Sequence, residues 1–515
     1  MTQLNEASRP GADSALEDDS GALMELLRIA APSVATMASY TVMQFVDKLM
    51  VKEIGPDPVY IAAQGNGGVT AWTAMTFVVG MSGVVSSFVS QNLGAGKPER
   101  GSAYAWNAMW IGLAYWAVLM LPALLVIRPL FESYGHDGDL LRYEVQYAQI
   151  LIGCSVVTVL TKAIQNYFFG LHRPGVVMVA TVLGNLTNIG ANYLLIFGHF
   201  GFPEMEVAGA AWGTVIGTSV ELLIPLAVFL SPGFHERFGT RRAWRVSGTC
   251  VRDLFGVGWP AGLTFLSELV CWQYLMSNLI GRAGQRAAEL TGAGAAMVEQ
   301  AATVANTAGF IGLQYMHLSF MPAVGISIAT QAVVGKAIGA GRPDLAVRRT
   351  WLALRLAVAY MGTCALVFVL FRTWLVQAFV NQGEGDHAAE VAAEVIRVGG
   401  QVMLCAAVFQ VFDAMAITMS AALRGAGDTV WPGLVTVVVS WGCIMGLGHV
   451  VIEVFPEWGS LGPWSAAAAY IILLSLLYLW RFLGGKWRSI KLTHDDPLHN
   501  LPPDQMAPGA SPGAA

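Results

Sequence analysis

The feature that most constrains this chain is a pentapeptide that occurs twice. Gly94 to Pro98 reads Gly-Ala-Gly-Lys-Pro, and about 245 residues later Gly339 to Pro343 reads Gly-Ala-Gly-Arg-Pro. Each copy closes a long apolar segment and is followed by a Trp at the same offset, Trp106 and Trp351. A repeat of this period indicates that the second half of the chain duplicates the first.

The composition is that of a membrane protein. Charged residues are 12% and hydrophobic residues 55% of the 515 residues, and the mean hydropathy is +0.56. An ordinary soluble domain carries about 25% charged residues. The sequence shows no basic stripe or nucleic-acid-binding motif, so nucleic acid is not an expected partner. The six cysteines are scattered singly without CxxC spacing and are interpreted as free thiols.

Twelve apolar segments have the length that a membrane span needs, about 20 residues. They divide six and six, which predicts an all-α integral membrane fold with twelve transmembrane helices in two pseudo-symmetric six-helix lobes. We expect the lobes over residues 22–231 and 253–485, a basic cytoplasmic linker over 232–252, and disordered tails over 1–21 and 486–515. The expected spans are 22–50, 59–92, 101–129, 143–170, 174–198, 207–231, 253–281, 297–337, 347–372, 390–421, 430–453 and 462–483.

The distribution of Lys and Arg predicts the orientation. With both termini cytoplasmic, the cytoplasmic connections and tails hold about nineteen of the 29 basic residues. Both Gly-Ala-Gly turns then face the cytoplasm, where glycine permits a tight turn and proline begins the next helix. Neither copy has the GxxxxGK[ST] spacing of a P-loop or a strand before it, so both turns are interpreted as structural.

Carboxylates inside the spans are the leading functional candidates, because an ionised group in hydrocarbon costs several kcal/mol unless it faces water, a partner or a cation. Asp47 lies late in the first span, Glu268 lies in the seventh, and Asp413 lies deep in the tenth. For Asp47 the competing interpretation is a span end in the headgroups. Glu221 in the sixth span ranks lower, and Lys162 in the fourth is expected to extend toward the cytoplasmic surface.

Uncharged polar residues accompany Asp47 in the first half. Tyr40 and Gln44 share its helix face and are candidates for the wall of a substrate cavity. Asn188 and Asn192 are four residues apart in the fifth span. Carboxylate and amide oxygens are hard ligands, so Asp47, Asn188 and Asn192 form a possible Na⁺ site. The alternative for the asparagines, and the favoured one for Thr214 in the sixth span, is interhelical hydrogen bonding.

These segments together resemble the multidrug and toxic compound extrusion transporters, and more closely their NorM-like bacterial branch. The resemblance covers residues 22–485 and rests on the order and spacing of several segments. They are Phe45-Val46-Asp47, the two Gly-Ala-Gly turns, Asn188-Ile189-Gly190-Ala191-Asn192-Tyr193, the Glu268 segment, Phe412-Asp413-Ala414 and Leu423-Arg424-Gly425-Ala426-Gly427-Asp428-Thr429.

The resemblance implies a V-shaped bundle in the bacterial inner membrane. Asp47, Asn188, Asn192 and Thr214 are then similar to the family's cation site in the first lobe, and Glu268 and Asp413 to its acidic pair in the second. Some relatives carry a Tyr one turn before the second-lobe Asp, where this chain has Phe409. That change removes an oxygen ligand and weakens the case for Na⁺ in this lobe.

The expected function is therefore secondary active export of organic cations, coupled by alternating access to inward flow of Na⁺ or H⁺. Aromatic walls such as Trp272 and Phe409 would favour lipophilic cations, although core or lipid-facing packing is the competing interpretation for both. We expect a monomer that contacts membrane lipid and needs no cofactor. A flippase for lipid-linked saccharides is the alternative, with a more cationic cavity expected. An enzyme is not expected, since no nucleophile, metal set or phosphate site is recognisable.

Overall fold

The computed structural model describes residues 19–380 and 386–493, which contain helices and no strand. In the first lobe the helical segments are α2 (Asp19–Lys52), α3 (Val59–Ser82), α4 (Val85–Gly94), α5 (Pro98–Tyr115), η2 (Trp116–Met120), α6 (Leu121–Ala123), α7 (Ile127–Ser133), α8 (Gly138–Gly153), α9 (Ser155–Gly170), α10 (Pro174–Phe197), η3 (His199–Gly201) and α11 (Glu206–Leu230).

A short helix, α12 (Pro232–Phe238), follows the first lobe. The second lobe contains α13 (Gly248–Tyr274), η4 (Leu275–Leu279), α14 (Ile280–Leu290), α15 (Ala295–Gly339), α16 (Pro343–Gln377), α17 (Asp386–Ala426), α18 (Val430–Ser440), η5 (Trp441–Leu447), α19 (Gly448–Val454), η6 (Pro456–Trp458), α20 (Leu461–Leu483) and η7 (Lys486–Ser489).

These segments form the twelve expected membrane crossings. Among the described residues, ten continuous helical segments are long and apolar enough to span a membrane, and the pair α8 and α9, bent by 47°, makes an eleventh. The 34-residue helix α2, which carries charged residues at both ends, makes the twelfth. The prediction of an all-α, two-lobed fold is confirmed.

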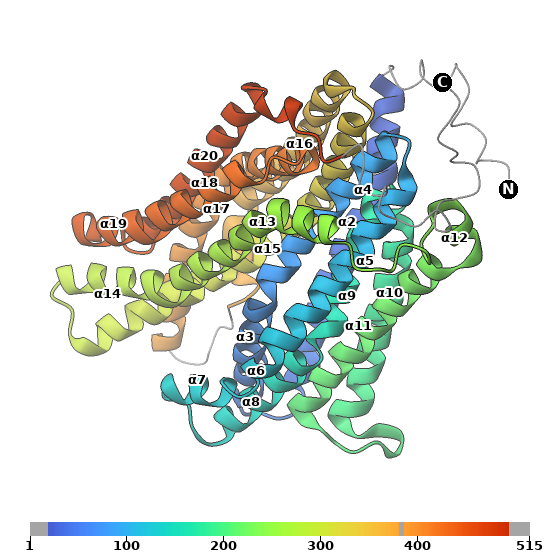
Figure 1. Cartoon of the computed structure of the whole chain (residues 1–515). Coiled ribbons are helices and arrows are strands. Elements are labelled where there is room, and N and C mark those ends of the chain that lie inside the picture. The colour runs from blue at the N-terminus through green and yellow to red at the C-terminus, as the bar shows by residue number, and fades with distance from the viewer. Residues whose placement is uncertain (1–18, 381–385, 494–515) are drawn as a thin grey trace, which may run out of the picture.

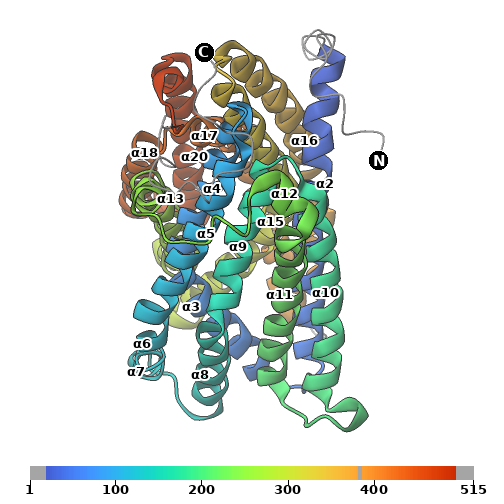
Figure 2. The ribbon, with the colours of Figure 1, turned by 45° about the vertical axis from the view of Figure 1, so that its right-hand side comes forward.

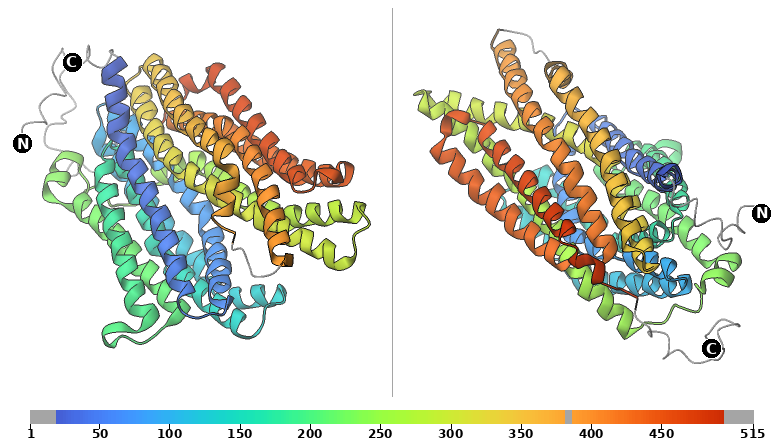
Figure 3. Two further views of the ribbon diagram at one scale, coloured as in Figure 1. Left: turned by 180° about the vertical axis from the view of Figure 1, so that it is seen from behind. Right: turned by 90° about the horizontal axis from the view of Figure 1, so that it is seen from above.

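The two lobes diverge from one end of the bundle (Figure 1). We call the end at which α2 begins and α20 ends the termini face. From it the first-lobe helices α9, α10 and α11 run side by side (Figure 2), while the second-lobe helices fan away from them (Figure 3). Helix α2 packs against α10 of its own lobe and α15 of the other, and α13 packs in the equivalent way against α3. Two spans of each lobe thus form the contact between the lobes.

The repeated turns meet each other at the termini face. Gly96 and Gly341 have φ angles of 73° and 70°, which glycine adopts without strain, and Pro98 and Pro343 begin the following helices. Gly339 packs directly on the backbone of Gln91, because a Cβ built on it would lie 1.9 Å from the Gln91 carbonyl oxygen. Gly94 packs in the same way on Lys336, at 2.0 Å. The duplicated motif is therefore a contact between the lobes as well as a turn.

Side-chain hydrogen bonds reinforce this contact. The Ser87 hydroxyl donates to the Arg424 carbonyl oxygen at 2.7 Å, and the Gln91 amide donates to the Gly425 carbonyl oxygen at 3.0 Å. In the opposite direction, the Gln331 amide donates to the Gly83 carbonyl oxygen at 2.9 Å. These bonds all join one lobe to the other, so separating the lobes here would leave their polar groups to find new partners.

The C-terminal tail begins later than predicted. Residues 486–493 were expected to be disordered, but the Trp487 side chain is fully buried and donates its indole N–H to the Phe482 carbonyl oxygen at 2.7 Å. The Leu492 amide donates to Gln91 Oε1 at 3.0 Å. The basic and polar residues of this segment favoured a disordered tail, but the Trp487 and Leu492 side chains pack on the bundle. Residues 1–18 and 494–515 lie outside the described part of the chain.

Candidate functional site: acidic clusters in the two lobes

The first acidic cluster lies between α2, α10 and α11. Asp47 is 8% exposed and its Oδ1 accepts a hydrogen bond from Asn192 Nδ2 at 2.7 Å. The same amide lies 3.5 Å from Asn188 Oδ1, and Asn188 Nδ2 lies 3.5 Å from Thr214 Oγ1. The four residues predicted from three separate spans are thus neighbours in space. Asp47 is buried between the helices of the lobe.

One buried oxygen of this cluster could accept a hydrogen bond or coordinate a cation. Asn192 Oδ1 is buried and accepts no hydrogen bond from the described residues. A buried acceptor of this kind ordinarily has a partner. Together with the Asp47 carboxylate and the Asn188 and Thr214 oxygens, it provides hard ligands of the type that Na⁺ binds. Tyr147 of α8 adds a hydroxyl beside Thr214 and Asp47, which sequence spacing could not have placed there.

The second acidic cluster lies in the other lobe. Glu268 on α13 accepts a hydrogen bond from the Tyr470 hydroxyl of α20 at 2.6 Å. Asp413 on α17 is close enough to Glu268 to interact with it electrostatically, and so is Arg424 at the end of α17. The predicted acidic pair is brought together. No local pattern predicts the positions of Tyr470 and Arg424 beside Glu268, because both residues are far from Glu268 in the sequence.

The predicted wall residues occupy different environments. Phe409 is 3% exposed and packs within the hydrophobic core of the second lobe. The Trp272 ring lies 6.4 Å from that of Trp464 and packs against the same core. Gln44 is exposed on α2. None of these three contacts an acidic side chain through a hydrogen bond found among the described residues.

Tyr40 belongs to a third cluster, one centred on Glu221. Its hydroxyl donates to Glu221 Oε1 and accepts a hydrogen bond from Lys162 Nζ at 2.8 Å. Glu221 is 4% exposed. Lys162 lies eight residues before the end of α9, about 12 Å from it along the helix, and its ammonium points to Tyr40. The expectation that Lys162 extends to the membrane surface is wrong, because its ammonium donates hydrogen bonds to the Tyr40 hydroxyl and to Gln165 Oε1 within the lobe.

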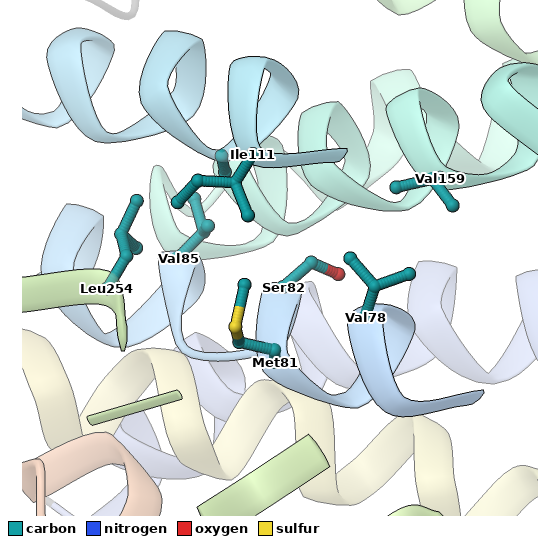
Figure 4. A pocket seen from close by; sticks show the side chains of 8 residues that line it. Val78, Met81, Ser82, Val85, Ile111, Val159 and Leu254 are labelled. Carbon is teal, nitrogen blue, oxygen red and sulfur yellow. The ribbon is translucent and has the colours of Figure 1, made fainter. Parts of the chain in front are cut away.

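A small pocket in the first lobe does not add to these sites (Figure 4). Its only polar side chain is Ser82, whose hydroxyl donates to the Val79 carbonyl oxygen at 2.7 Å. The pocket is a packing gap beside α13 without a charged group. The remaining lining residues are Val78, Met81, Val85, Ala108, Ile111, Val159 and Leu254.

Comparison with known proteins follows the same division into halves. The MatE family model matches residues 32–194 and 293–448, one block in each lobe. A probable multidrug resistance protein NorM from Pseudomonas aeruginosa is 28% identical over 469 residues, covering 89% of each chain. A protein of the same name from Thermotoga maritima is 26% identical over 427 residues, covering 81% of this chain and 83% of its own.

The fold also matches solved structures. The outward-facing conformation of a multidrug resistance MATE family transporter of the MOP superfamily superposes with a TM-score of 0.77 at 20% identity, covering 93% of this chain and 98% of the other. At this identity the match shows the fold alone. The family model, however, spans more than half of the described chain and includes Asp47, Asn188, Asn192 and Asp413. The chain therefore belongs to the MatE family, the multidrug and toxic compound extrusion transporters.

Proposed function

We propose that this protein exports organic cations by antiport against inward flow of Na⁺ or H⁺. The observation that carries the proposal is that each lobe holds an acidic cluster among its helices, buried at Asp47 and partly buried at Glu268 and Asp413, and that the two clusters differ in chemistry. In the first, Asp47 lies among neutral oxygen ligands. In the second, Glu268 lies close enough to another carboxylate, Asp413, to interact with it electrostatically.

The first cluster favours Na⁺. Its carboxylate, amide and hydroxyl oxygens are hard ligands, and the unpaired Asn192 oxygen gains a partner when a cation binds. Asp47 and the asparagines lie on different helices, so a bound cation would draw α2 toward α10. Such a ligand biases the two access states by the difference between its affinities for them.

The second cluster favours H⁺. Two carboxylates that face each other repel when both are ionised, and a proton on either one relieves that repulsion. The Tyr470 hydroxyl stabilises an ionised Glu268, while Phe409 supplies no oxygen ligand one turn before Asp413. An incoming organic cation satisfies the same negative charge, so cation and proton compete.

The remaining expectations are part of the same proposal. Residues 22–231 and 253–485 act as the two moving lobes, joined by the basic linker over 232–252. The protein lies in the inner membrane with both termini cytoplasmic. In this orientation the end of the bundle that we call the termini face lies on the cytoplasmic side. We propose a monomer that carries small organic cations, requires no cofactor and performs no catalysis.

The direct test uses proteoliposomes that contain the purified full chain and an imposed ion gradient. Addition of an organic cation should dissipate a Na⁺ or H⁺ gradient in step with cation movement. Translocation of labelled lipid, with neither gradient affected by the organic cation, would contradict the proposal and support a flippase instead.

Replacing Tyr470 by phenylalanine should weaken the second cluster. The change removes a hydrogen bond to a charged group, worth about 1.5–3 kcal/mol, and leaves the ring in place. We expect H⁺-driven transport to fall about tenfold or more while the protein remains folded. The matched control is Tyr193→Phe, because the Tyr193 side chain is 47% exposed. Equal H⁺-driven rates in the two variants would show that Tyr470 does not support coupling.

A further inference from the structure

The third cluster has the composition of a site for an organic ammonium ion. It contains a buried carboxylate on α11, Glu221, a phenol ring on α2, Tyr40, and an ammonium group on α9, Lys162. Lys162 Nζ lies 4.5 Å from the centroid of the Tyr40 ring and 2.8 Å from its hydroxyl oxygen. Attraction to an aromatic face and a hydrogen bond to a neighbouring oxygen are the interactions by which proteins recognise ammonium groups.

The carboxylate of this cluster is held in place by neutral donors. Glu221 Oε1 accepts hydrogen bonds from the Tyr40 hydroxyl, from Gln165 Nε2 at 2.6 Å and from the Thr181 hydroxyl. Gln165 also accepts a hydrogen bond from Lys162 Nζ at 3.2 Å. The donors come from α2, α9 and α10, so three helices converge on one buried carboxylate. Such an arrangement fixes both the position and the negative charge of the site.

Lys162 balances that charge from within the chain. It is the basic residue that acts electrostatically on Tyr40, and Glu221 is the carboxylate that acts on Lys162. The Lys162 ammonium does not contact the carboxylate directly: Lys162 Nζ donates to the Tyr40 hydroxyl, and that hydroxyl donates to Glu221 Oε1. In the second cluster, Arg424 acts on Glu268 electrostatically without a hydrogen bond to it among the described residues. The third cluster therefore links an ammonium of the protein to its acid through an aromatic hydroxyl.

We propose that Glu221 and Tyr40 form an ammonium-binding site in the first lobe, and that Lys162 fills this site in the present conformation as a tethered cation. A substrate ammonium group takes the site by displacing Lys162. The inference rests on the proposed transport of organic cations and narrows the substrate class. Because the Tyr40 hydroxyl accepts an N–H from the ammonium, the site selects protonated primary to tertiary amines over quaternary ammonium ions.

The test is calorimetric binding of two matched probes, phenethylammonium and its N,N,N-trimethyl analogue, to the purified full chain in detergent. Lys162→Met removes the tethered competitor and keeps an apolar stem of similar length. We expect phenethylammonium to bind this variant at least tenfold more tightly than wild type, and the trimethyl analogue to gain less than threefold. Adding Glu221→Gln to Lys162→Met should abolish the gain. Lys162→Arg, which keeps a tethered cation, should bind like wild type.

Two results would overturn the inference. One is equal affinity of phenethylammonium for Lys162→Met and for the double variant, which would make Glu221 irrelevant to binding. The other is an equal gain for both probes, which would remove the role of the Tyr40 hydroxyl. If Lys162→Met is too unstable for calorimetry, its thermal unfolding gives the same test, since phenethylammonium should raise its Tm saturably and only when Glu221 is present. Binding in detergent needs no ion gradient, so the result is independent of whether antiport itself is demonstrated.

Discussion

Replacing Gly339 by alanine is expected to lower transport at least about tenfold. The added Cβ would lie 1.9 Å from the Gln91 carbonyl oxygen, which is backbone and cannot rotate away. Overpacking typically costs about 1–3 kcal/mol, and a cost confined to one access state shifts the equilibrium by about 5–150-fold. Since the lobes meet here at the termini face, the variant should favour states in which this face is open. Gly94→Ala should act in the same direction, because its Cβ would lie 2.0 Å from the Lys336 carbonyl oxygen.

The measurement combines transport in proteoliposomes with thiol labelling of a cysteine placed at Ser90, whose hydroxyl is buried beside the contact. Faster labelling in Gly339→Ala than in the parent would report the opened face. Gly362→Ala is the matched control, since a Cβ on Gly362 would meet nothing within 4 Å. If Gly339→Ala transported and was labelled at the wild-type rates, transport would not require the close contact between Gly339 and Gln91.

Replacing Asp47 by asparagine should remove Na⁺ binding from the first lobe. The substitution keeps the size of the side chain and an oxygen to accept the Asn192 hydrogen bond, but leaves only neutral ligands. Removing one partner of a buried charge pair typically costs about 3–5 kcal/mol, which corresponds to at least a hundredfold loss of affinity. Stabilisation of the purified protein by Na⁺ should therefore be lost at concentrations that saturate the wild type.

Thermal unfolding in NaCl and in an equal concentration of N-methyl-D-glucamine chloride measures this effect. Glu457→Gln, which removes an exposed carboxylate, controls for loss of charge and should retain the Na⁺ response. An unchanged Na⁺ response in Asp47→Asn would remove Asp47 from the coupling site. Loss of the response in both variants would attribute it to net charge.

Sequence patterns could predict the fold because its main determinants are local. The apolar runs need only their length to be read as spans, and the duplicated turn sets the register of the two halves. The same sequence patterns could not predict that Gly94 packs on the second lobe and Gly339 on the first. That contact depends on how two spans separated by about 245 residues cross, which no local pattern specifies.

The number of helices that must pack together decides how well sequence patterns predict each site. Asn188 and Asn192 share a helix face, so their joint placement beside Asp47 needed only one correct pairing of helices. The Glu221 cluster needed four helices, α2, α9, α10 and α11, to converge. Read alone, Lys162 looked like a residue that reaches for the surface, and only the position of Tyr40 on another helix shows why it stays inside.

The central claim is that acidic side chains within the spans of the two lobes couple ion flow to export. It is tested most directly by the rate of organic-cation transport in proteoliposomes with Na⁺ and pH gradients imposed separately, for wild type and for Asp47→Asn, Glu268→Gln and Asp413→Asn. We predict that Asp47→Asn loses Na⁺-driven transport and that Glu268→Gln and Asp413→Asn lose H⁺-driven transport. Normal transport by all three variants under both gradients would contradict the claim.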